Sequence, residues 1–148
     1  WIYNNFYKSK IRHMMDKLIT KFLQNNQLLS FGVIDDDGVY SASCYYAFDE
    51  KNISLLIKSD PESKHIKLAD KNPKIAITIA RDSKKLLLIK GVQIKASFAK
   101  SNNDEKEIYY SRFPFAKLGT GEIYTLKILW LKYTDNKLLV SNKIIFTK

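Results

Sequence analysis

The sequence predicts a mainly β fold, an antiparallel barrel of six or seven strands with peripheral helices. Short apolar runs are separated by turn residues, and the helical segments do not alternate with the strands in a βαβ rhythm. The 148 residues are 45% hydrophobic and 27% charged, an ordinary balance for a globular chain with one core. We therefore expect a single domain over residues 1–148, with residues 1–9 as a loose N-terminal extension.

The first elements are a helix and three strands. Apolar residues recur at three- and four-residue steps over 10–27, which predicts an amphipathic helix that ends at two asparagines. The turn at 35–38, three aspartates and a glycine, predicts a hairpin of strands 28–34 and 39–48, and a third strand follows over 53–58. Adjacent carboxylates in a tight turn point in different directions, so we interpret them as solvated and expect no metal site.

The second half is predicted to contain two helices and four strands. Asp60 is a favourable N-cap and Pro61 suits the first helical position, so a helix is expected over 60–71. A second helix is expected over 104–113, capped by Asn102 or Asn103. The four strands are expected at residues 74–80, 85–99, 123–133 and 138–146. A glycine at position 91 is expected to make a bulge or bend in the strand at 85–99.

The formal charge is +10, from 25 basic and 15 acidic residues. An anionic partner, such as nucleic acid, a membrane surface or a phosphorylated ligand, is one explanation. A solvated lysine-rich surface is the other, and we favour it because the lysines are spread along the whole chain and arginine is scarce. We therefore expect no specific nucleic-acid binding. Apolar runs such as residues 86–89 are far too short for a membrane span, so no membrane partner is expected either.

Cys44 is the one cysteine in the sequence, so no intrachain disulfide can form. This favours a reducing, cytoplasmic location. A catalytic thiol needs a histidine partner, and the two histidines, His13 and His65, lie in no recognisable motif. We therefore interpret Cys44 as a buried, unreactive thiol.

Residues 58–65, KSDPESKH, gather hydroxyl, ammonium and imidazole groups where a strand gives way to a helix. Because N–H groups at a helix N-terminus attract anions, Ser59, Ser63 and Lys64 are candidates to hold a phosphate, with His65 beside it. A capped, exposed helix explains the same residues, and the carboxylates in the segment favour that alternative. The residues alone leave both interpretations open. The sequence has no glycine-rich phosphate loop, zinc motif or serine-hydrolase elbow.

The order of these motifs resembles the pyridoxamine 5'-phosphate oxidase-like family of FMN-binding split barrels. The resemblance covers about residues 14–146 and is strongest to a small bacterial subgroup of unassigned activity. The motifs that carry it are Ser59, Ser63-Lys64-His65, Asn72-Pro73 and GVQIKA at 91–96, with RFPFAK at 112–117 and YTDNKL at 133–138 shared with the subgroup.

The resemblance implies a split barrel that forms a homodimer with FMN at the subunit interface. The implied role is that of an FMN-dependent oxidoreductase of unknown substrate, and no catalytic residue follows from it. The implied cofactor-binding residues are Ser59, Ser63 and Lys64 at the phosphate with His65 beside them, Ser43, Cys44 and Tyr45 along the isoalloxazine ring, Gln93 in the strand that lines the flavin pocket, and Arg112 of the shared motif.

The sequence departs from the family pattern at three places, and these differences bear on the phosphate contact and on the substrate. Lys64 stands where the family usually has arginine, which removes a bidentate phosphate contact. Residues 139–143 replace a glycine-rich segment of the subgroup. The C-terminal arginine pattern with which pyridoxamine phosphate oxidases hold their substrate is also missing, so oxidation of pyridoxamine phosphate is not expected.

Two alternative functions stay open at the level of the sequence. Split-barrel relatives include haem-degrading proteins, so a haem or tetrapyrrole protein would use His13 or His65 as an axial ligand. A non-catalytic basic module would bind nucleic acid or protein through lysines and the tyrosine pairs at 45–46 and 109–110.

Overall fold

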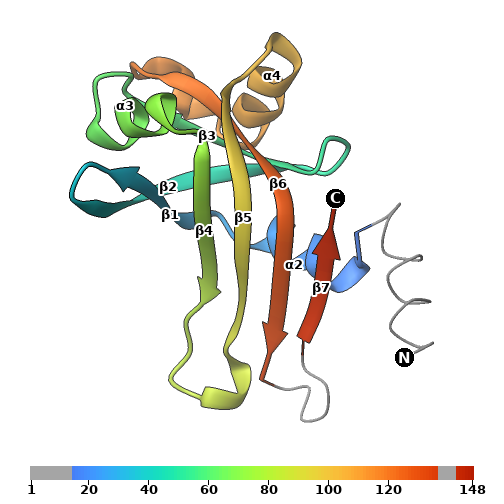
Figure 1. Ribbon diagram of the computed structural model, residues 1–148. Helices are drawn as coiled ribbons and strands as arrows, with labels where there is room; N and C mark the ends of the chain where they lie inside the picture. Colours follow the sequence, from blue (N-terminus) through green and yellow to red (C-terminus); the bar gives the residue numbers. More distant parts are fainter. Residues whose placement is uncertain (1–14, 137–142) are drawn as a thin grey trace.

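The computed structural model describes residues 15–136 and 143–148 and shows a closed β-barrel (Figure 1). The strands of the described residues pair antiparallel in the order β3-β2-β1-β4-β5-β6-β7, and a further pairing of β3 with β6 closes six of them into the barrel. The antiparallel barrel predicted from the sequence is confirmed. The strands are β1 (Leu28–Asp35), β2 (Gly38–Asp49), β3 (Ser54–Ser59), β4 (Lys74–Arg81), β5 (Lys90–Lys100), β6 (Glu122–Asp135) and β7 (Lys143–Thr147), of which β7 extends the sheet beyond β6.

The helices pack around the barrel. Figure 1 shows α3 and α4 together at one end of the molecule and α2 farther along it. Helix α2 buries Ile19 and Leu23, and α3 buries Ile66 and Ala69, so each helix turns its apolar stripe to the core. The helices are α2 (Lys17–Asn25), α3 (Lys64–Lys71) and α4 (Asn103–Arg112), with short 3-10 helices η1 (Leu86–Leu88) and η2 (Pro114–Leu118).

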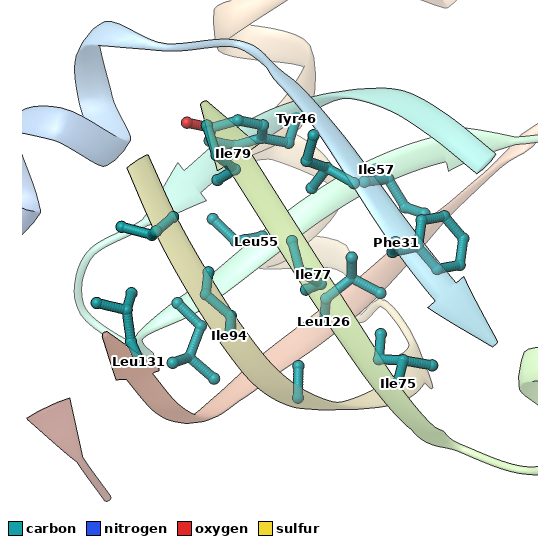
Figure 2. Packing of buried hydrophobic residues seen from close by; sticks show 14 of the residues in the cluster. Phe31, Tyr46, Leu55, Ile57, Ile75, Ile77, Ile79, Ile94, Leu126 and Leu131 are labelled. Carbon is teal, nitrogen blue, oxygen red and sulfur yellow. The ribbon is translucent and has the colours of Figure 1, made fainter. Parts of the chain in front are cut away.

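The core lies inside the barrel and follows the two-residue period of the strands. In β4, Ile75, Ile77 and Ile79 are buried, whereas the residues between them are exposed. In Figure 2 these side chains point into the same core as Phe31 from β1, Tyr46 from β2 and Leu126 from β6. The alternation leaves a second, outward face on β1, β2, β4 and β5 that the core does not use.

Several local predictions are confirmed by the backbone. The hairpin of β1 and β2 closes at the pairing of Asp35 with Gly38, and Gly38 has a φ of 150° that favours glycine. Helix α4 is capped by Asn102, whose side chain accepts from the Glu105 N–H while the Glu105 carboxylate accepts from the Asn102 N–H.

The start of α3 differs from the prediction. The helix begins at Lys64 with Ser63 as its N-cap, and not at Asp60-Pro61. The Asp60 carboxylate instead accepts a hydrogen bond of 2.9 Å from the Glu62 N–H, which makes the preceding turn. Both Asp60 and Ser63 suit a cap by residue type, and the competing turn decides between them.

The β4–β5 connection also differs. Part of the segment expected as strand forms η1, and β5 begins only at Lys90. The expected bulge at Gly91 is wrong, because the register shift lies between Lys95 and Ala96. A Cβ on Gly91 would lie 3.2 Å from the carbonyl oxygen of Ile79, so this glycine permits a close approach of β4 and β5.

Some predictions lie outside the described residues. They are the extension at 1–9, the first part of the helix at 10–14 together with His13, and the first part of the last strand at 138–142, where most of the altered 139–143 segment falls. Within the described part of the chain, no helix is long and apolar enough to cross a membrane.

Candidate functional site

Three polar side chains converge where β3 ends and α3 begins. The Ser59 Oγ lies 2.8 Å from Nε2 of His65 and 3.3 Å from the Ser63 Oγ, and the Ser63 Oγ lies 3.4 Å from the same nitrogen. Ser59 is placed by the last pair of the β3–β6 ladder, opposite Glu122. Ser63 does not cap α3 with its side chain, and its hydroxyl donates instead to the Asp60 carbonyl at 2.6 Å. We call Ser59, Ser63 and His65 the junction cluster.

The imidazole of His65 lies between the two serine hydroxyls of the junction cluster and the core. Its ring packs edge-on against Phe31, with ring centroids 5.4 Å apart. Burial lowers the pKa of His65 below its ordinary value, so the ring is neutral at pH 7. A neutral imidazole has one donor and one acceptor nitrogen, so Nε2 is able to accept from a hydroxyl or donate to an anion according to its tautomer.

The Lys64 side chain contacts residues outside the junction cluster. Its Nζ forms an ion pair with the Asp35 carboxylate at 2.9 Å and lies 4.7 Å from the centroid of the Tyr40 ring. A hydrogen bond from Lys64 lowers the pKa of Asp35, and the same bond raises the pKa of Lys64. The Lys64 side chain is 56% exposed and the Asp35 side chain is 16% exposed, so solvent screens this pair only from the lysine side.

A second group of predicted residues lies on the outward face of the sheet. Ser43 on β2 pairs with Ser30 on β1, which pairs with Thr78 on β4, which pairs with Gln93 on β5. The Ser30 and Ser43 hydroxyls are 3.0 Å apart. Tyr45 lies two residues from Ser43 and is 57% exposed on the same face. The structure therefore brings Ser43, Tyr45 and Gln93 onto one surface.

Cys44 lies on the opposite face of β2 from Ser43 and Tyr45. Its side chain is part of the core, and burial raises the pKa of its thiol to about 11. A thiol of this kind stays protonated and unreactive at neutral pH. The prediction of a buried thiol is confirmed, and any part Cys44 has in a ligand site is through the packing beneath the strand.

Arg112 is separate from the junction cluster. Its Nη2 donates to the carbonyl oxygen of Asn26 at 2.7 Å, and its guanidinium lies 5.5 Å from the centroid of the Phe113 ring. Arg112 therefore joins the end of α4 to the segment between α2 and β1. It approaches the outward face only through Phe113, whose ring lies 6.1 Å from that of Tyr45.

Sequence reasoning missed the residues that surround the predicted ones. Phe31 buttresses His65, and Asp35 and Tyr40 engage Lys64. The run of aspartates at the hairpin turn was a visible signal, but no local pattern places that turn beside α3. Among the described residues, no group of three His, Cys, Asp or Glu side chains is placed to hold a metal ion.

The chain is similar along most of its length to proteins of the UPF0306 family. It is 48% identical over 135 residues to a UPF0306 protein of Campylobacter jejuni, an alignment that covers 90% of this chain and 99% of the relative. A UPF0306 protein of Haemophilus ducreyi is 31% identical over 136 residues, which cover 88% of this chain and 93% of that one. No protein-family model matches the chain.

Solved structures show the same barrel at low identity. An FAD-binding protein from Mesorhizobium loti matches with a TM-score of 0.66 and 16% identity, over 77% of this chain and 87% of that one. A heme binding protein from Mycobacterium smegmatis matches at 0.68 and 11%, over 82% and 53%. The heme storage protein HutZ from Vibrio cholerae matches at 0.61 and 15%, over 78% and 90%. These likenesses establish the fold as a split barrel.

Proposed function

Because this chain belongs to the UPF0306 family and folds as a split barrel, we propose that it is a cytoplasmic FMN-binding protein and a flavin-dependent oxidoreductase of unknown substrate. The observation that carries the proposal is the junction cluster, in which Ser59, Ser63 and His65 converge within 3.4 Å of one another. A solved neighbour with this fold is an FAD-binding protein. The missing C-terminal arginine pattern argues against pyridoxamine phosphate as the substrate.

The donor set of the junction cluster suits the phosphate of FMN. Two hydroxyls and an imidazole nitrogen would each donate a hydrogen bond to a phosphate oxygen once they give up their present partners, which for Ser63 is the Asp60 carbonyl. Lys64, between Ser63 and His65 in the sequence, adds a positive charge. The Lys64 side chain is 56% exposed and that of Asp35 is 16% exposed, so solvent reaches the ammonium side of the pair, and the ammonium group would exchange its carboxylate for a phosphate there.

The outward face suits the flavin ring. Gly32 and Ala76 are cross-strand partners next to Ser30 and Thr78, so small side chains leave a flat surface there. Ser43, Tyr45 and Gln93 would hold and orient the isoalloxazine ring on this surface. Bound flavin supplies hydride and single-electron transfer, and the chain supplies binding, orientation and the polarity around the ring.

We further propose that the protein is a homodimer in which this surface is covered. Tyr45 is 57% exposed, and Phe115 and Leu118 in η2 are 86% and 88% exposed. Aromatic side chains next to Arg112 match the composition of protein interfaces. An isologous dimer should bury more than about 1,200 Å² in total. Sedimentation that shows only monomer at tens of micromolar protein would contradict this part of the proposal.

Haem is the second candidate ligand. Burial keeps the half-buried His65 neutral, which is the form that binds iron, and two of the solved neighbours are heme proteins. In this alternative Nε2 of His65 would leave its hydrogen bond with Ser59 and become an axial ligand.

Reconstitution separates the two candidates. Ligand-free protein is incubated with FMN or with hemin, passed over a gel-filtration column, and its visible absorption spectrum is recorded. The proposal predicts flavin bands that elute with the protein at one FMN per chain, and a lower yield with Ser59→Ala. A Soret band from hemin with no retained FMN would favour the second candidate, and a colourless protein in both experiments would refute both.

A further inference from the structure

A cavity of about 270 Å³ is lined by residues of α2 and of β4, β5 and β6. Figure 1 shows the end of β4 and the start of β5, which contribute to it, at the opposite end of these strands from α3 and α4. Three basic side chains line it, namely Lys21 from α2, Arg81 from β4 and Lys90 from β5. The rings of Phe22 and Tyr133 form apolar walls, with their centroids 5.6 Å apart. None of the described lining residues is acidic.

The charges around this basic cavity are only partly neutralised. The Lys90 Nζ lies 3.6 Å from the Asp135 carboxylate, which also accepts a hydrogen bond of 3.3 Å from the Tyr133 hydroxyl. Lys21 and Arg81 form no ion pair with any described residue. Two cations therefore face the same small space without a carboxylate from the described chain. The carbonyl groups at the C-terminal end of α2 carry only about half a negative charge in total and do not balance them.

We propose that the basic cavity binds a small phosphate-bearing molecule. Two unpaired cations match the double negative charge of a phosphate monoester, and the planar guanidinium of Arg81 is able to bind two of its oxygens at once. The volume is just below the roughly 300 Å³ at which pockets for drug-sized ligands begin, so the ligand is inorganic phosphate or a phosphorylated molecule of a few carbon atoms. The apolar rings would contact the carbon part of a phosphorylated ligand.

This site is independent of the proposed flavin site. Ser59 of the junction cluster pairs with Glu122, the first residue of β6, whereas Lys90 pairs with Asp135, the last residue of the same strand. The two sites therefore lie toward opposite ends of the longest strand, separated by roughly 40 Å of chain along it. Neither the junction cluster nor the outward-face residues line the basic cavity.

Titration with inorganic phosphate tests the proposal on the 148-residue chain. Amide chemical shifts are followed by ¹⁵N–¹H NMR as phosphate is added at constant ionic strength, and the experiment is repeated with glycerol 3-phosphate. We expect saturable shifts at Lys21, Asn25 and Lys90. Arg81→Gln and Lys21→Gln should each weaken the binding by about tenfold or more, because each removes a charge-assisted hydrogen bond.

Lys84→Gln is the matched control, because Lys84 is an exposed lysine of the neighbouring turn that does not line the cavity. It should leave the phosphate affinity unchanged, and Arg81→Gln should leave FMN binding unchanged. Tighter binding of glycerol 3-phosphate than of inorganic phosphate would identify a phosphorylated metabolite as the ligand. Shifts confined to residues 59–65, shifts that do not saturate by about 10 mM phosphate, or an affinity unaffected by Arg81→Gln would each overturn the proposal.

Discussion

The exchange of Lys64 between Asp35 and a flavin phosphate gives a prediction with two opposite arms. Lys64→Ala removes the ammonium group that would bind the phosphate. Asp35→Asn removes the carboxylate with which that ammonium group pairs at 2.9 Å. If Lys64 contacts the phosphate, the first substitution must weaken FMN binding and the second must strengthen it. Riboflavin lacks the phosphate, so its affinity should respond to neither.

The size of each effect follows from the exposure of the pair. A charge-assisted hydrogen bond to phosphate is worth roughly 10- to 150-fold in affinity. The pair with Asp35 competes with this bond and reduces the effect by about two- to fivefold, because solvent screens the pair from the side of the 56% exposed Lys64. Lys64→Ala should therefore weaken FMN binding by about 2- to 75-fold, and Asp35→Asn should strengthen it by about two- to fivefold.

Fluorescence titration of FMN and riboflavin measures both arms. Lys67→Ala is the matched control, because Lys67 lies one turn along α3, is 59% exposed, and pairs with Glu62 at 2.8 Å. It should change neither affinity. Equal losses for FMN and riboflavin in Lys64→Ala would mean that Lys64 acts through folding or through the ring. An unchanged FMN affinity in both Lys64→Ala and Asp35→Asn would refute the assignment of Lys64 to the phosphate.

Three further predictions concern titration, reactivity and packing. Burial lowers the pKa of His65, so the unfolded chain binds a proton at this residue more readily than the folded chain, and the free energy of unfolding should fall as the pH drops through 6.5. Urea unfolding at several pH values should show a flatter pH dependence in His65→Asn, and an unchanged pH dependence would contradict the prediction. The Cys44 thiol, with its pKa near 11, should react with iodoacetamide at pH 8 about 100-fold more slowly than in urea-unfolded protein, and equal rates would show it to be accessible. Leu126→Ala leaves a cavity at a fully buried position in the barrel and should lower the free energy of unfolding, measured in urea, by about 2–5 kcal/mol. A loss below about 1 kcal/mol would contradict the packing described for β6.

The fold was predictable from the sequence wherever local chemistry decides it. The hairpin of β1 and β2 follows from an aspartate-glycine turn between apolar runs, and the start of α4 follows from its capping box. The start of α3 was not predictable to the residue, because Asp60 and Ser63 both suit a cap. The displaced bulge in β5 likewise depends on how that strand fits β6.

The candidate site was predictable only in part, for a related reason. Ser59, Ser63 and His65 lie within seven positions of one another, so a strand-to-helix junction was enough to bring them together. The row from Ser43 to Gln93 depends on the pairing of β1 with β4, two strands far apart in the sequence, and the Asp35 partner of Lys64 depends on the hairpin turn lying beside α3. Cys44 is adjacent in the sequence to Ser43 and Tyr45 but does not share their surface. Successive side chains of a strand point to opposite faces, so Cys44 is buried whereas its neighbours face outward.

The ³¹P NMR spectrum of FMN bound to the protein tests most directly whether the junction cluster holds a flavin phosphate. The account predicts a phosphorus resonance displaced from that of free FMN, which returns toward the free value in Ser59→Ala and His65→Asn variants that still bind the flavin ring. Bound FMN whose phosphorus resonance and titration match those of free FMN would place the phosphate in solvent and contradict the account.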